Sequence, residues 1–208
     1  MLRLSIVILS VLVLLVINEL WWRSSKHHSE LNRKFVHITV GTFVAFWPYF
    51  LSWNYIKLLS ALFIVVVLVS KHLRLFKSIH SVERTTWGEL FFALIVGLLA
   101  FITTDRAIYA VSLLQMSLAD GLAAVVGLRY GAKNAYRIAG NKKSVIGTLA
   151  FLVVSFTILT IYALHFGTIG MPVILSSAVV ATLIENISPF GLDNLLVPLL
   201  VALMLHGF

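Results

Sequence analysis

The chain has 208 residues, of which 60% are hydrophobic and 12% charged, and its mean hydropathy is +1.01. This composition excludes a water-soluble globular domain and predicts a single integral-membrane domain over residues 1–208. The net charge of +8 lies in short connectors, where membrane orientation explains it, so we expect no nucleic-acid partner. Because the sequence has no cysteine, disulfides and thiolate metal sites are excluded.

Apolar runs predict an all-α bundle with about eight membrane spans, or seven. The predicted spans are residues 4–20, 35–53, 55–69, 87–102, 107–128, 145–166, 171–187 and 192–208. Several are shorter than the roughly 20 residues that cross a bilayer upright, so boundaries will shift by a few residues. A basic connector, residues 71–84, is predicted to lie along the membrane surface.

The distribution of charge predicts the orientation of the bundle. All but three of the 16 Lys and Arg residues lie in the connectors after the first, third and fifth spans. By the positive-inside tendency these connectors face the cytoplasm, which leaves both termini on the non-cytoplasmic side. With eight spans, the turn at residues 188–194 also reaches the cytoplasmic face. We therefore expect the polar motifs to gather at that face.

Asp120 is a carboxylate inside an otherwise apolar helix. Such a charge costs a few kcal/mol in a bilayer, so it has a functional role by default, although a structural pair with an Arg would also explain it. Ala123, Ala124, Gly127 and Gly131 share its helical face. Because this face has little bulk, a ligand or another helix can approach closely.

The connector that follows Asp120 is the most basic in the chain. It carries Arg129, Lys133, Arg137, Lys142 and Lys143. We expect a flexible loop there, because Gly131 and Gly140 interrupt it. A carboxylate beside a cationic loop suits a metal-bound polyphosphate.

Two further motifs lie where spans enter the membrane. In ELNRKFVH, the residues Arg33, Lys34 and His37 share a helical face with Glu30. An interfacial cap of ion pairs would explain Glu30, Arg33 and Lys34, but His37 lies a full turn deeper. In ERTTWGEL, Glu89 opens the fourth span, where it is either functional or simply favoured by the positive end of the helix.

A fourth motif, ENISPFGLDN, spans the turn between the last two predicted helices. It places Glu185 and Asn186 before the turn and Asp193 and Asn194 after it. Turns often have this composition. Two acids and two amides without a nearby cation are also typical oxygen ligands for a metal.

These motifs, in this order, resemble those of the CTP-dependent lipid-alcohol kinases, a family that includes dolichol kinase, phytol kinase and yeast-type diacylglycerol kinase. The nucleotide-binding motif is matched by Asp120, Ala123, Gly127, Gly131, Lys142, Lys143, Ser144 and Gly147. The resemblance covers about residues 30–203. One position departs from the family pattern, because Ile146 stands where a glutamate is usual.

The resemblance implies transfer of the γ-phosphate of CTP, or of another nucleoside triphosphate, to the hydroxyl of a long isoprenoid or lipid alcohol on the cytoplasmic face. Mg²⁺ is expected on Asp120 with Glu185 or Asp193. Candidate groups for the nucleotide are Arg33, Lys34, Lys142, Lys143, Ser144, the glycines Gly127, Gly131 and Gly147, and Asn194. Glu89 or His37 is expected to take the hydroxyl proton.

Two other functions fit the same residues. A cytidylyltransferase acting on phosphatidate would use similar metal and triphosphate groups, but it would release pyrophosphate rather than CDP. A transporter could use Asp120 and Glu185 as relays, although no inverted repeat is evident. Ile146 adds a degenerate, inactive relative as a further alternative. Neither the particular alcohol nor the oligomeric state is predicted by the sequence.

Overall fold

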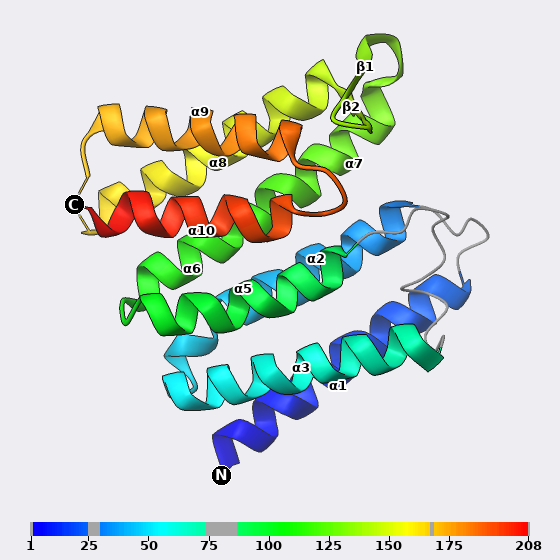
Figure 1. The fold of residues 1–208 in the computed structure, drawn as a ribbon, viewed down its shortest axis with the longest axis vertical. Helices are drawn as coiled ribbons and strands as arrows, with labels where there is room; N and C mark the ends of the chain where they lie inside the picture. The colour runs from blue at the N-terminus through cyan, green and yellow to red at the C-terminus, as the bar shows by residue number, and fades with distance from the viewer. Residues whose placement is uncertain (1, 25–29, 74–86, 167–168, 208) are drawn as a thin grey trace.

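The computed structural model describes residues 2–24, 30–73, 87–166 and 169–207, which form a bundle of helices (Figure 1). In this part of the chain there are eight continuous helical segments, so the all-α prediction is confirmed. They are α1 (Leu2–Ser24), α2 (Glu30–Ala45), α3 (Trp53–Leu73), α5 (Gly88–Ile102), the continuous α6 (Arg106–Leu114), η2 (Gln115–Asp120) and α7 (Gly121–Tyr130), α8 (Val145–Phe166), α9 (Met171–Ile187) and α10 (Asp193–His206). Most of the predicted surface connector 71–84 lies outside the described residues.

Two helices are long and apolar enough to cross a membrane, namely Arg106–Tyr130 with 25 residues and Val145–Phe166 with 22 residues. The other apolar helices, such as Gly88–Ile102 and Met171–Ile187, are shorter. These helices support a membrane protein. The count of eight spans and the side on which the termini lie stay predictions.

The second predicted span has different bounds in the structure. We predicted residues 35–53, but α2 begins at Glu30 and ends at Ala45, and a short 3₁₀ helix, η1 (Trp47–Tyr49), follows. Pro48 explains the early end, because proline has no N–H and disfavours a helical conformation in the residue before it. The segment with Arg33, Lys34 and His37 is therefore helical from its first residue.

The helices are arranged in layers (Figure 1). Helices α8 and α9 pack together on one side, α10 contacts α5, α6 and α9, and α2 packs on α6 and α7. Helix α3 packs on α5, and α1 contacts α2 on the far side. The core includes the fully buried side chains of Tyr109, Leu99 and Phe151. Helix α1 begins and α10 ends away from the end where α7 meets α8 and where α9 turns into α10.

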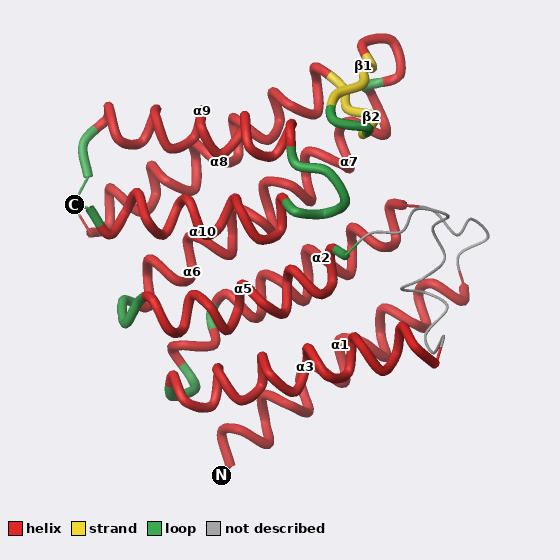
Figure 2. The backbone as a smooth tube through the Cα atoms, viewed as in Figure 1, coloured by secondary structure: helices red, strands yellow, loops and turns green. Residues whose placement is uncertain are grey.

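The connector between α7 and α8, which follows Asp120, is an ordered hairpin and not the flexible loop that we predicted (Figure 2). Strands β1 (Ala135–Ile138) and β2 (Asn141–Ser144) pair antiparallel, after a single 3₁₀ turn, η3 (Ala132–Asn134). Ala139 and Gly140 connect them with φ of 47° and 79°. Positive φ at both central positions gives the tight turn whose twist matches that of paired strands.

Candidate functional site

Three carboxylates from distant parts of the sequence meet at one end of the bundle. Asp120 ends η2, Glu185 lies in the last turn of α9, and Asp193 begins α10. One oxygen from each lies within 4.8 Å of the other two. Asp120 and Glu185 are only 6% and 4% exposed, and Asp193 is half-buried. The structure therefore brings together all three residues that we predicted as metal ligands.

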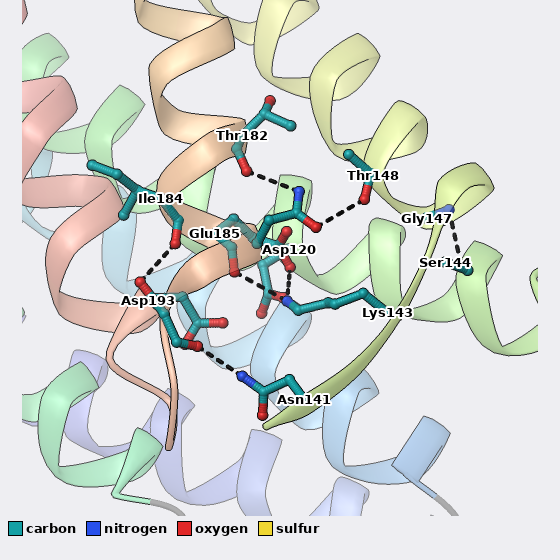
Figure 3. Close-up of polar contacts among 12 residues, drawn as sticks. Asp120, Asn141, Lys143, Ser144, Gly147, Thr148, Thr182, Ile184, Glu185 and Asp193 are labelled. Carbon is teal, nitrogen blue, oxygen red and sulfur yellow. Dashed lines mark hydrogen bonds and ion pairs between the residues drawn. The ribbon is translucent and has the colours of Figure 1, made fainter. Parts of the chain in front are cut away.

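Two lysines neutralise two of these acids. Lys34 Nζ on α2 lies 2.5 Å from Asp120 Oδ2, and Lys143 on β2 pairs with Glu185 (Figure 3). Lys143 Nζ also donates to the backbone oxygen of Glu185 at 3.1 Å. Asp193 has no lysine partner among the described residues. Arg33, half-buried, precedes Lys34 on α2.

The charge of Lys143 is secured by its surroundings. Burial lowers the pKa of this amine, but Glu185, Asp120 and Asp193 raise it by more, so the pKa of Lys143 lies above its ordinary value.

The neighbouring Lys142 points the other way, because side chains alternate along a strand. Lys143 is half-buried against the acids, whereas Lys142 is exposed on the opposite face of β2. The two predicted phosphate ligands therefore point in opposite directions.

A π-helical turn shapes the position of Asp120. Residues Gln115–Asp120 form η2 within the long α6–α7 helix, a feature that the sequence did not predict and that is frequent at functional sites. The Met116 oxygen in this turn lies 3.1 Å from His37 Nε2, which is also 3.7 Å from Asp120 Oδ2. The edge of the His37 ring packs against Phe92, with ring centroids 5.9 Å apart. His37 therefore lies beside the carboxylate cluster.

The start of α5 holds the α9–α10 turn in place. Asn194 Nδ2 donates to the Gly88 oxygen at 3.1 Å, and the Trp87 N–H donates to the Phe190 oxygen at 3.0 Å. Gly191, with φ of 85°, packs directly on the backbone of Gly88 and has no room for a side chain, and a Cβ at Gly88 would lie 2.9 Å from Asn194 Nδ2. Asn194 thus hydrogen-bonds to the backbone of α5, and this contact fixes the position of the adjacent Asp193. Glu89, half-buried in the first turn of α5, has no ion pair with the described residues.

The predicted row of small residues brings α7 against α8. A Cβ at Gly127 would lie 2.9 Å from Ser144 Oγ and 3.5 Å from Gly147 Cα, and one at Gly147 would lie 2.9 Å from the same hydroxyl. Gly131 faces Ser144 as well. Ser144 is buried and accepts the Gly147 N–H at 3.1 Å, which caps α8. These four residues contact one another. Of the two possibilities that the sequence left open for the small face, a ligand or another helix, the structure shows the helix.

A polar network that the sequence did not predict fixes the hairpin. The Tyr136 hydroxyl hydrogen-bonds to Thr148 Oγ1 at 2.6 Å and donates to Asn186 Oδ1. Asn141 Nδ2 donates to the Ser188 oxygen at 2.9 Å. Because Tyr136 is paired with Lys143 across the hairpin, this network positions the Lys143 side chain opposite Glu185. Asn186 was visible in the sequence as the neighbour of Glu185, but nothing linked it to Tyr136.

The fold and the site define a helical membrane protein with a buried charged site at one end of the bundle. The chain is 35% identical over 195 residues to phytol kinase of Synechocystis sp., with 89% of this chain and 82% of that protein covered. It is 29% identical to a probable chloroplastic phytol kinase 2 of Oryza sativa subsp. japonica, with 82% of this chain and 63% of that protein covered. No family model and no solved structure matches the chain. The chain therefore belongs to the lipid-alcohol kinase family that includes phytol kinase.

Proposed function

We propose that this protein transfers the γ-phosphate of CTP to the hydroxyl of phytol or a related long-chain isoprenoid alcohol. The observation that carries the proposal is the convergence of Asp120, Glu185 and Asp193 with Lys34 and Lys143. Both relatives are named as phytol kinases, which supports an isoprenoid acceptor. The proposed site faces the cytoplasm, where the nucleotide is available.

The donor set fits Mg²⁺. This ion prefers oxygen ligands, and carboxylates are common among them. One oxygen from each of the three carboxylates lies within 4.8 Å of the other two, so a single ion would be within reach of all three after small side-chain movements. The bound ion would supply positive charge to neutralise the phosphate groups. The residues that would hold it are Asp120, Glu185 and Asp193.

The two lysines are the proposed triphosphate ligands, with Arg33 as a third cation. Lys34 and Lys143 each form an ion pair with a carboxylate that would also hold the metal. Their ammonium groups would therefore lie beside any phosphate bound there. In the transfer, the bond from the γ-phosphorus to its bridging oxygen breaks and a bond to the alcohol oxygen forms. CDP leaves with the electron pair, and the alcohol loses its proton.

His37 is the proposed acceptor of that proton, with Glu89 as the alternative. His37 Nε2 lies 3.7 Å from Asp120 Oδ2, so this nitrogen is the one that borders the site where the proton would be released. The role of Gly127, Gly131, Gly147 and Ser144 in this proposal is to hold α7 and β2 together and not to touch the nucleotide. The alcohol would enter from the bilayer between helices.

The test uses purified protein, a panel of lipid alcohols and CTP, ATP or GTP labelled in either the α- or the γ-phosphate. The proposal expects γ-label in the lipid product, release of CDP, and a preference for CTP with phytol or a close relative. Transfer of α-label with release of pyrophosphate would show a cytidylyltransferase instead. Absence of label in every alcohol, from protein that melts cooperatively, would refute the kinase.

A further inference from the structure

The connector between α7 and α8 carries a second group of cations besides Lys143. This group consists of Arg129, Lys133, Arg137 and Lys142, which we call the basic connector surface. All four side chains are exposed. Arg129 lies in the last turn of α7, Lys133 in η3, and the other two on the hairpin. The proposed phosphoryl transfer uses none of these four.

In the part of the chain that the structure describes, these cations have no acidic partner. The sequence contains no Asp or Glu between Asp120 and Glu185. Among the described residues, none of the four cations forms an ion pair. Arg137 and Lys142 are directly opposite each other across the hairpin, an arrangement of like charges that is destabilising by itself. A shared anion would remove this repulsion.

The surroundings identify the anion. The connector joins the two helices that are long and apolar enough to cross a membrane. Apolar side chains at the helix ends next to it are exposed, Leu128 by 52% and Val145 by 49%. Tyr130 is 59% exposed, and the Arg129 guanidinium lies 5.5 Å from its ring centroid. Aromatic and cationic side chains at the end of apolar helices are typical of the headgroup region of a bilayer.

We propose that the basic connector surface binds the headgroups of anionic phospholipids. Attraction to an anionic membrane surface is worth about 1 kcal/mol per cation, which corresponds to roughly fivefold in affinity. Strand β2 carries Lys142 toward the headgroups and Lys143 toward Glu185, so a bound lipid steadies the strand that positions Lys143. This consequence for catalysis rests on the proposed function, whereas lipid binding does not.

The experiment titrates phosphatidylglycerol or phosphatidylcholine into the full-length protein in detergent and measures bound lipid by native mass spectrometry. The variant is Lys133→Gln/Arg137→Gln. Its matched control is Lys57→Gln/Arg106→Gln, which removes two cations at the opposite end of the bundle, at the starts of α3 and α6. No nucleotide is present, so the result stands whether or not the protein is a kinase.

We expect the wild type to bind phosphatidylglycerol in preference to phosphatidylcholine. The Lys133→Gln/Arg137→Gln variant should bind it roughly 25-fold more weakly, and the control variant by less than about threefold. Equal binding by both variants, with unchanged melting temperatures, would overturn the proposal. A separate kinase assay of the same variant in lipid-free detergent gives a second test. A raised KM for CTP without loss of lipid binding would also overturn the proposal, because the surface would then be a nucleotide site.

Discussion

Replacing Asp120 by Asn is the sharpest test of the carboxylate site. The change keeps the side-chain shape and an oxygen that Lys34 Nζ can reach, now 2.5 Å away, but it removes the charge. Because a buried hydrogen bond is retained, we expect unfolding to become easier by only about 1–3 kcal/mol. Loss of a preorganised charge beside the reacting phosphate should cost about 3–4 kcal/mol in the transition state, or roughly 10²–10³ in kcat.

The assay measures transfer of γ-label to the alcohol by purified protein over a range of Mg²⁺ concentrations, together with the melting temperature. Asp105→Asn is the matched control. Asp105 Oδ1 caps α6 by accepting from Ala107 N at 2.7 Å and Ile108 N at 3.0 Å, and Asn caps helices equally well. If Asp120→Asn retains kcat within about threefold of the control, Asp120 does not take part in the chemistry.

Three further substitutions, the first with its own matched control, test the elements around the carboxylates. Lys143→Gln should raise the KM for CTP by about tenfold or more through loss of a charge-assisted contact, whereas Lys142→Gln should change it by less than about twofold; equal effects would mean that the hairpin faces are wrongly assigned. Gly127→Ala places a Cβ 2.9 Å from Ser144 Oγ and should lower the free energy of unfolding by about 1–3 kcal/mol, measured by thermal denaturation in detergent. Tyr136→Phe removes the hydroxyl between α8 and α9 and should raise the KM for CTP severalfold while kcat changes little, so a kcat effect alone would contradict a positioning role.

The raised pKa of Lys143 also sets the upper end of the pH range over which its ion pair stabilises the protein. A group whose folded pKa exceeds its unfolded value stabilises fully below the unfolded pKa, and the contribution disappears as pH rises through the folded one. The ordinary value for this lysine is 10.5, so the contribution is complete throughout neutral pH. The difference in melting temperature between wild type and Lys143→Gln should therefore be constant from about pH 6 to about pH 9.

The sequence predicted the bounds of the helices and the meeting of the three acids better than it predicted the structure of the connections. An apolar run is a continuous signal over the whole length of a helix, so α8 and α9 begin and end where predicted. Asp120, Glu185 and Asp193 were each visible as acids without a local partner, which is why their meeting could be anticipated. Their distances could not, because these depend on how α9 and α10 pack against the π-helical turn.

The hairpin and the π-helical turn were missed for different reasons. The segment NAYRIAGNKK has weak apolar alternation, and Ala139-Gly140 is not the Asn-Gly pair that usually signals a tight hairpin turn. A π-helical turn has no comparable sequence signal, since it arises where packing favours one extra residue in a helix. Both features decide which way Lys143 and Asp120 point, so the direction of these side chains could not be predicted.

The departure at Ile146 can be tested with the same logic. This residue is half-buried in the first turn of α8, where the positive end of the helix favours a carboxylate, so Ile146→Glu should fold with little change in melting temperature. Three carboxylates already meet without it, and a fourth, if it reached the cluster, would add repulsion where only two lysine partners are present among the described residues. We therefore expect kcat for phosphoryl transfer to stay level or to fall. A gain of about tenfold or more would show that the family's usual glutamate acts in the chemistry and that the three acids alone do not complete the site.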